Sequence, residues 1–354
     1  MHGFFTWNVV TSPKIAMLAS IIPQACSITL TLYNHPMQTL CTLSGLVLSG
    51  IFFALPSTTR VEAASIPESL NVQGGFIVHL GCGDGEQTLN LRPNESYQVH
   101  GLDKDPENVS LARAKVREAG LYGPVSIDRF AGPTLPYIDD MVNLVVVEKL
   151  GEIPMSEVMR VLAPEGVAYV NRGGEWTTTI KPRPDDIDDW THFLHGPGGN
   201  AVARDKKVGP PRHLQWLGSP RWSRHHDRMA SMSALVSSGG RVFYVMDEGS
   251  RVSIQLPARW TLVARDAFNG VILWKKPMKK WQSHLWPLKS GPTQLARRLV
   301  AVDDRVFITL GVDEPVSVLD SATGKLIHEL PESKGAEEVV VDGGQVFVLE
   351  SPAE

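Results

Sequence analysis

The chain has 354 residues, 43% of them hydrophobic and 20% charged, a composition that excludes a disordered protein and leaves room for roughly two domains. The net charge is −4 and the basic residues are scattered, so we expect no nucleic acid partner. Cys82 is the one cysteine outside the N-terminal region, which excludes an internal disulfide in the folded part.

Residues 1–64 differ from the rest of the chain. Met37–Leu55 is an uncharged apolar run, typical of an export signal or a membrane-spanning helix. The sequence RVEAAS follows, with Val61 and Ala63 at the small positions that signal peptidases prefer. We expect an exported protein of the periplasm or cell envelope, with this segment either cleaved or kept as a membrane anchor.

Residues 65–180 alternate apolar runs with helical patterns, as parallel βαβ units do. Helices are predicted over 105–120, opened by Asp105, and over 154–166, ended by Pro164. The pattern indicates a Rossmann-like, doubly wound α/β sheet. Its predicted strands are GFIVHL (75–80), YQVHGLD (97–103), VSIDRF (125–130), MVNLVVVE (141–148) and GVAYVN (166–171).

A glycine-rich loop ends the first of these strands. Gly81, Gly83 and Gly85 remove side chains where a phosphate or nucleoside would approach the backbone. Asp103 ends the next strand, where a carboxylate can accept hydrogen bonds from both ribose hydroxyls. The alternative is that Asp103 caps the following helix, a role that Asp105 could also fill.

Four blocks, HLGCGDG, GLDKDP, LPYIDDMVNLVVVE and EVMRVLAPEGVAYV, stand in the order and spacing of class I S-adenosylmethionine-dependent methyltransferases, which this span resembles. The resemblance implies S-adenosylmethionine as cofactor and methyl transfer to an unknown acceptor, mainly by positioning, without naming a catalytic residue. The cofactor-binding residues that it implies are Gly81, Cys82, Gly83, Asp84, Gly85, Asp103, Lys104 and Asp128.

Two positions depart from that family. His79 stands where an acidic residue is common, and Ala131 where an Asp often reaches the adenine amine. Asp84 and Asp128 are nearby carboxylates that could substitute. After Asn171 the sequence offers one short polar strand in place of the closing strand pair. These departures leave open a non-catalytic binding or scaffold protein with a degenerate cofactor site.

Residues 181–209 are predicted to be a linker, with proline and acidic turn residues. Histidines in and after it form the one cluster with metal-ligand chemistry, but their spacing fits no standard site. We therefore expect structural histidines and no metal. The cluster consists of His192, His195, His225, His226 and Asp227.

Residues 210–354 show short strands bounded by turn signals, an all-β pattern. LVARDAFNGVILWKKP and VSVLDSATGKLIHELP repeat one phrase: an apolar strand, an Asp, a turn with Gly, and a second strand. The phrase resembles the repeats of pyrroloquinoline-quinone-type β-propellers. The matching residues are Asp266, Gly270 and Trp274 in the first copy, and Asp320, Gly324 and His328 in place of Trp in the second.

This resemblance implies a partial propeller, of about two blades and the start of a third, in a fragment of a longer protein. The chain lacks the vicinal cysteine pair of quinone-dependent dehydrogenases, so we do not expect bound pyrroloquinoline quinone here. A fragment of a quinoprotein-type oxidoreductase remains the further alternative, and the partner could be a methyl acceptor or another protein.

Overall fold

The computed structural model describes residues 6–10, 66–207, 209–210, 214–219, 232–253, 256–282 and 293–350. In this described part, no helix has the length and apolar character needed to cross a membrane. The predicted export or anchor run, Met37–Leu55, lies outside the described residues.

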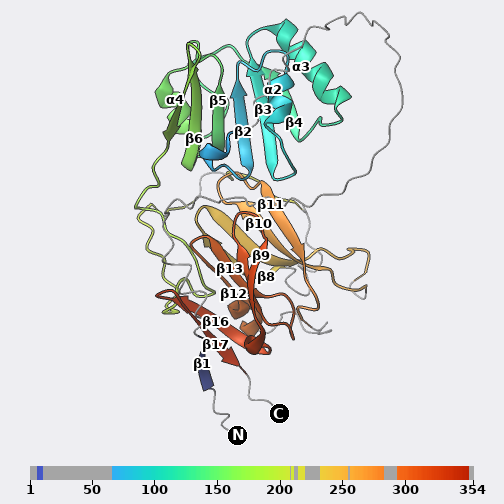
Figure 1. Ribbon diagram of the computed structural model, residues 1–354, viewed down its shortest axis with the longest axis vertical. Helices are drawn as coiled ribbons and strands as arrows, with labels where there is room; N and C mark the ends of the chain where they lie inside the picture. The colour runs from blue at the N-terminus through green and yellow to red at the C-terminus, as the bar shows by residue number, and fades with distance from the viewer. Residues whose placement is uncertain are drawn as a thin grey trace, which may run out of the picture. The chain divides into compact units, whose positions relative to one another are not determined.

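The first sheet has six strands in the order β4-β3-β2-β5-β6-β7 (Figure 1). Neighbouring strands are parallel except β7, which runs antiparallel to β6. The predicted Rossmann-like α/β sheet is confirmed, and β7 is the single polar strand expected after Asn171. The strands are β2 (Gly75–Leu80), β3 (Tyr97–Asp103), β4 (Val125–Arg129), β5 (Val142–Val147), β6 (Leu162–Arg172) and β7 (Glu175–Ile180).

Helix α3 (Pro106–Glu118) covers one face of this sheet. Its N-cap is Asp105, whose carboxylate accepts a hydrogen bond from the backbone N–H of Glu107 at 2.9 Å. The predicted inward face is confirmed, because Val109, Ala112 and Val116 join a buried cluster with side chains of β2, β3 and β4. The shorter elements near this face are η1 (Glu68–Leu70) and α2 (Glu86–Asn90).

Helix α4 (Met155–Val161) covers the opposite face, where it packs against the alternate side chains of β2 and β5. It is shorter than the predicted helix over 154–166. Leu162 is already extended and pairs with Val142 of β5, and a residue before proline, here Ala163, is disfavoured in helical conformation. Pro164 therefore lies inside β6, beyond the end of the helix.

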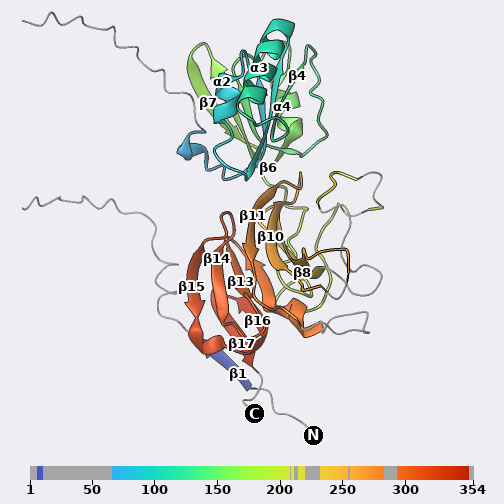
Figure 2. The same cartoon turned by 90° about the vertical axis from the view of Figure 1, so that its right-hand side faces the viewer.

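The described strands from Met232 onward pair antiparallel. Two sheets have four strands in up-and-down order, β8 to β11 and β12 to β15, and a third joins β16 and β17 with β1 (Figure 2). The remaining short helices are η2 (Thr293–Arg298) and η3 (Pro331–Ser333). The strands are β1 (Thr6–Val10), β8 (Met232–Ser238), β9 (Arg241–Asp247), β10 (Trp260–Asp266), β11 (Ile272–Pro277), β12 (Leu299–Val302), β13 (Arg305–Thr309), β14 (Val316–Asp320), β15 (Leu326–Leu330), β16 (Ala336–Asp342) and β17 (Gln345–Glu350).

A tryptophan packs on the glycine turn of each four-stranded sheet. Trp216 covers Gly270, and Trp274 covers Gly324; a Cβ on these glycines would lie 2.4 and 2.6 Å from the indole rings. In both places the indole N–H donates, at 2.9 Å, to the backbone carbonyl three residues before the glycine. Because Trp274 belongs to β11 and Gly324 follows β14, this contact joins the two sheets.

The segment 181–209, predicted as a linker, is integrated into the all-β part. Trp190, Thr191 and His192 accept hydrogen bonds from backbone N–H groups of β8, β12 and β16, at 2.7, 2.9 and 3.1 Å. These strands belong to three different sheets. Consecutive residues of one segment therefore fasten all three sheets, and His192 has a structural role.

Substituting Gly324 tests the tryptophan contact. Gly324→Ala places a Cβ into the indole of Trp274 at a left-handed φ of +68°, and we expect a loss of about 2–4 kcal/mol in the free energy of unfolding, measured in urea. Gly343→Ala is the matched control, because its φ is +53° and no described atom lies within 4 Å of the added Cβ. It should lose only about 1 kcal/mol; equal losses would contradict the packing role.

The burial of His192 predicts a pH dependence of stability. Desolvation lowers the pKa of His192 from 6.5 to about 4, and a proton on Nε2 would remove the acceptor of the Val341 N–H. The unfolded chain then binds more protons between these two pH values, so the stability present above pH 6.5 falls toward pH 4, by up to about 3 kcal/mol.

Urea titrations at several pH values measure this slope. His192→Asn should flatten it, whereas His328→Gln, on the outer strand β15, should keep it. An unchanged slope in the His192 variant would contradict the assignment.

Candidate functional site

The glycine loop after β2 has three left-handed glycines, with φ of +77° at Gly81, +53° at Gly83 and +83° at Gly85. Their surroundings differ. A Cβ on Gly85 would lie 2.7 Å from the Cβ of Ala112 in α3, whereas no described atom lies within 4 Å of a Cβ on Gly83. Gly85 therefore allows α3 to pack closely, and Gly83 leaves bare backbone facing open space.

The carboxylate of Asp103, at the end of β3, points toward this loop. Its Oδ2 accepts the Gly83 N–H at 2.9 Å, and its Oδ1 accepts the Asp105 N–H at 2.9 Å and the Asn108 side-chain amide at 3.3 Å. The side chain is buried, with 8% of its surface exposed. Since Asp105 caps α3, Asp103 remains available to shape the loop and to accept further hydrogen bonds on its free lone pairs.

A cavity of about 520 Å³ opens beside the loop and Asp103, a size typical of small-molecule and cofactor sites. It lies at the carboxyl ends of four parallel strands, at the point where the chain order reverses between β2 and β5. Its wall consists of Leu80, Gly81, Gly83, Leu102, Asp103, Lys104, Asp105, Asn108, Phe130, Ala131, Gly132 and residues 149–153.

Four of the sequence-predicted site residues, Gly81, Gly83, Asp103 and Lys104, line this cavity. The other four do not. The segment Lys149–Ile153, which follows β5, was missed by the sequence analysis. The sequence does carry a signal for this segment, because the segment comes directly after a predicted buried strand. Its approach to the glycine loop, however, depends on β5 lying beside β2.

Two predicted residues belong to the loop but face away from the cavity. Cys82 is buried next to β3, and desolvation together with the Asp103 charge raises the pKa of its thiol to about 12, so it is not a nucleophile at neutral pH. Asp84 is exposed and pairs with Lys115 of α3, whose ammonium lowers the pKa of the Asp84 carboxyl.

Asp128, at the end of β4, has structural partners as well. It accepts hydrogen bonds from Arg113 at 2.6 Å and contacts the Nε2 of His100 at 3.1 Å. Neither Asp84 nor Asp128 lines the cavity, whereas Ala131 does.

His79, at the position where an acidic residue was expected, is buried with 1% exposure. Its Nδ1 is 2.8 Å from the Thr88 hydroxyl, and its Nε2 is 3.9 Å from Oε1 of Glu148. The imidazole lowers the pKa of the Glu148 carboxyl. Glu148 directly follows β5, so a carboxylate approaches His79 from the neighbouring strand.

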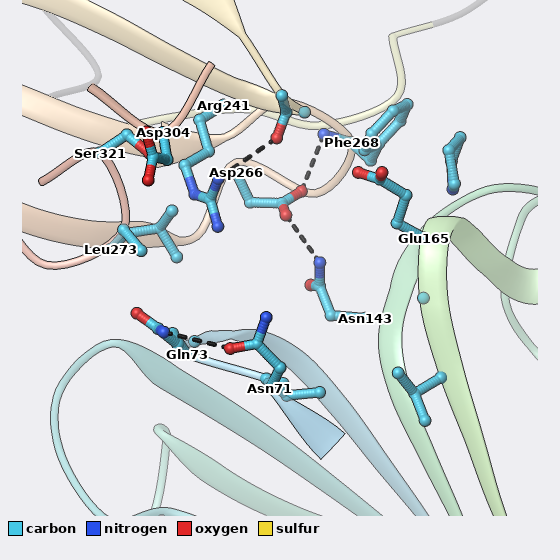
Figure 3. A pocket seen from close by; sticks show the side chains of 18 of the residues that line it. Asn71, Gln73, Asn143, Glu165, Arg241, Asp266, Phe268, Leu273, Asp304 and Ser321 are labelled. Atoms are coloured by element: carbon cyan, nitrogen blue, oxygen red, sulfur yellow. Dashed lines mark hydrogen bonds between the residues drawn. The ribbon is translucent and has the colours of Figure 1, made fainter. Parts of the chain in front are cut away.

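A larger cavity, of about 570 Å³, is lined by residues of the α/β sheet and of the β10–β11 turn (Figure 3). Asn143 connects the two, since its Nδ2 donates to Asp266 at 2.7 Å and its Oδ1 accepts from Asn269 at 2.7 Å and from the Phe76 N–H at 2.8 Å. Burial raises the pKa of Asp266. These bonds give the side chains of Asn143, Asp266 and Asn269 a structural role.

In the described part of the chain, no group of three or more His, Cys, Asp or Glu side chains could hold a metal ion. His195 pairs with Asp188 at 2.7 Å, as expected of a structural histidine. His225, His226 and Asp227 lie outside the described residues.

Comparison with known proteins agrees with this geometry. Residues 77–166 match the model of a family described as "Methyltransferase domain". Methyltransferase GfsG of Streptomyces halstedii is 32% identical over 106 residues, which are 28% of this chain and 38% of that protein. The chain thus spans little more than a third of this relative.

Solved structures with similarity include a S-adenosylmethionine-dependent methyltransferase from Methanosarcina mazei, 26% identical, with a TM-score of 0.26 over 29% of this chain and 56% of that one. Another is geranyl diphosphate C-methyltransferase from Streptomyces coelicolor A3(2), in complex with S-adenosyl-L-homocysteine, 18% identical, with a TM-score of 0.27 over 29% of this chain and 41% of that one.

The fold and the site thus define a Rossmann-like domain with a nucleoside-sized cavity at its switch point. The family match and the relative support a S-adenosylmethionine-dependent methyltransferase domain within this chain, with S-adenosylmethionine as its cofactor. The residues present fit that group, since the loop offers bare backbone at Gly83 and a carboxylate at Asp103.

Gly83→Ala and Gly85→Ala should separate binding from folding. The Gly83 variant fills open space beside the cavity, so we expect S-adenosylmethionine affinity to fall at least tenfold, with a stability loss of about 1 kcal/mol. The Gly85 variant meets Ala112 and should lose about 2–4 kcal/mol of stability. Calorimetric binding and urea unfolding measure both; a Gly83 variant that binds normally would contradict the assignment.

Proposed function

We propose that the domain of residues 65–180 binds S-adenosylmethionine in the cavity beside the glycine loop and transfers its methyl group to an acceptor. The carrying observation is the Asp103 carboxylate, held against the bare amide of Gly83 at 2.9 Å and lining the cavity. A carboxylate in this place suits the two hydroxyls of a ribose.

The remaining wall suits the rest of the cofactor. Phe130, Leu150 and Ile153 supply apolar surface of the kind that an adenine ring packs against. The bound cofactor supplies an activated methyl group. The contribution of the chain is then to hold and orient it, which is the positioning form of catalysis.

A second candidate is a binding scaffold, favoured by the all-β part. We propose that its two four-stranded sheets are propeller blades, because each carries the same aspartate and glycine turn under a tryptophan and up-and-down sheets of four strands are the blade pattern. In this reading the α/β domain, with His79 and Ala131 in place of acidic residues, is a docking module without activity.

Titration of S-adenosylmethionine into the full chain by calorimetry distinguishes the two candidates. We expect saturable binding, and we expect Asp103→Asn to weaken it about 10- to 100-fold, because hydrogen bonds to a charged group contribute about 1.5–3 kcal/mol.

Asp128→Asn is the matched control, since Asp128 ends the neighbouring strand outside the cavity wall and its loss should leave affinity within about twofold. Circular dichroism must show both variants folded. Absence of heat at millimolar ligand with folded protein would exclude the methyltransferase function and leave the scaffold.

A further inference from the structure

Arg241, at the start of β9, enters the larger cavity with most of its hydrogen-bonding groups unused (Figure 3). Within the described residues, its guanidinium donates one hydrogen bond, from Nη1 to the Gly239 carbonyl at 3.4 Å, and forms no ion pair. A guanidinium carries five N–H donors in a fixed fork. Burial lowers the pKa of Arg241, so its unmet donors are partly removed from water, and a ligand that accepts from them removes that cost.

Carboxylates surround this guanidinium without pairing with it. Their charges oppose the effect of burial on the Arg241 pKa, which places them near the cation. Figure 3 shows Arg241 with Asp304 on one side and Glu165 on the other. The four carboxylates are Asp266, Asp320, Glu165 and Asp304.

Two of these carboxylates remain available to a ligand. Asp266 and Asp320 are committed to their own glycine turns, where each accepts backbone N–H groups at 2.8–3.0 Å. The Glu165 side chain has no partner among the described residues, and Asp304 contacts only its neighbour Arg305, at 3.6 Å. The cavity therefore holds unused donors on Arg241 and unused acceptors on Glu165 and Asp304.

Glu165 is also held in an unfavourable backbone conformation. Its φ is +64°, in the left-handed region that glycine adopts more easily than any other residue. The side chain is exposed, so packing does not explain why a residue other than glycine stands there. Strain of this kind is typical of positions whose side chain has a function.

This cavity lies at the opposite edge of the α/β sheet from the cofactor cavity, and the two have no wall residue in common. Gly74 precedes β2 and Asn143 lies near the start of β5, whereas the cofactor loop follows the end of β2. A strand of six residues separates the two edges by roughly 20 Å. A molecule in this cavity is therefore too far away to receive the methyl group, and the cavity is a separate site.

We propose that this cavity binds a pyranose sugar, whose neighbouring hydroxyls accept hydrogen bonds from Arg241 and donate hydrogen bonds to Glu165 and Asp304. A hydroxyl accepts and donates at the same time, so hydroxyls on adjacent carbons connect a cation to carboxylates that do not touch it. The volume of about 570 Å³ is typical of small-molecule sites. The apolar residues of the wall, which suit the carbon face of a sugar ring, are Leu70, Ile180, Phe268 and Leu273.

The charges of the wall favour a neutral ligand over an ion. An anion would satisfy Arg241 but would be repelled by the carboxylates, which outnumber the guanidinium. A cation would be attracted by Glu165 and Asp304 but repelled by Arg241, whose donors it would leave unmet. A polyhydroxylated neutral molecule satisfies both kinds of group.

Three hexoses, D-glucose, D-galactose and D-mannose, test the proposal, because they differ in the orientation of single hydroxyls. Each is titrated into the full chain carrying ¹⁵N-labelled arginine. We expect at least one of them, at millimolar concentration, to shift saturably the Nε–H signal that is missing in Arg241→Lys. Cyclohexanol, a six-membered ring with one hydroxyl, should leave this signal in place.

Variants of the two charged groups, each with a matched control, measure their contributions. Arg241→Lys and Glu165→Gln should each weaken hexose affinity at least tenfold, because each loses hydrogen bonds to a charged group. The controls, exposed residues outside the cavity wall, are Arg251→Lys and Glu175→Gln, and both should bind as the unchanged chain does. All four variants should keep their S-adenosylmethionine affinity within twofold, since the proposal does not rest on the proposed function.

Glu165→Gly separates a binding role from a structural one. Glycine relieves the left-handed strain, so the urea midpoint of unfolding should rise while hexose affinity falls at least tenfold. A fall in both stability and affinity would mean that Glu165 serves the fold, and would contradict its role in binding.

The proposal is overturned if none of the three hexoses shifts the Arg241 signal, or if Glu165→Gln binds hexose as tightly as Glu175→Gln does. Inorganic phosphate and putrescine, titrated in the same way, represent an anion and a cation. A shift of the Arg241 signal by either of them, without one by a hexose, would replace the sugar site with a site for that ion. If Arg241→Lys does not fold, Glu165→Gln and its control decide.

Discussion

The hydrogen bond from the Gly83 amide to the Asp103 carboxylate, 2.9 Å long, fixes the geometry on which the site depends. It joins the end of β2 to the end of β3 across a loop that has no side chain at that point. The loop needs glycine twice for different reasons, since Gly83 faces open space and Gly85 allows Ala112 to approach. The same carboxylate accepts from the loop at Oδ2 and from Asp105 and Asn108 at Oδ1, and it lines the cavity.

The all-β part has a comparable organising contact in the tryptophan on each glycine turn. The same indole hydrogen bond of 2.9 Å occurs twice, once from Trp216, which precedes the first four-stranded sheet, and once between the two sheets. A second set of contacts holds the sheets together. Each of Trp190, Thr191 and His192 accepts a hydrogen bond from a strand of a different sheet. The sheets are thus held by side-chain packing and by one shared backbone segment.

Much of this was readable from the sequence because it is local. Apolar runs between helical patterns predicted all five parallel strands, Asp105 marked the start of α3, and the aspartate and glycine turns marked the repeats. What was missed depends on contacts between distant segments: the helix after Pro154 ends early because Leu162 pairs with Val142, and Lys149 reaches the site because β5 lies beside β2. The hydrogen bonds of segment 181–209 were missed for the same reason, since their partners are strands far along the chain.

His79 shows how such distant contacts can restore a chemical feature that one position has lost. An acidic residue on β2 would place a carboxylate beneath the first glycine; with histidine there, the carboxylate of Glu148 approaches from the neighbouring strand instead. Read alone, position 79 indicates a site that has lost its carboxylate, whereas the fold brings the Glu148 carboxylate within 3.9 Å of the same imidazole.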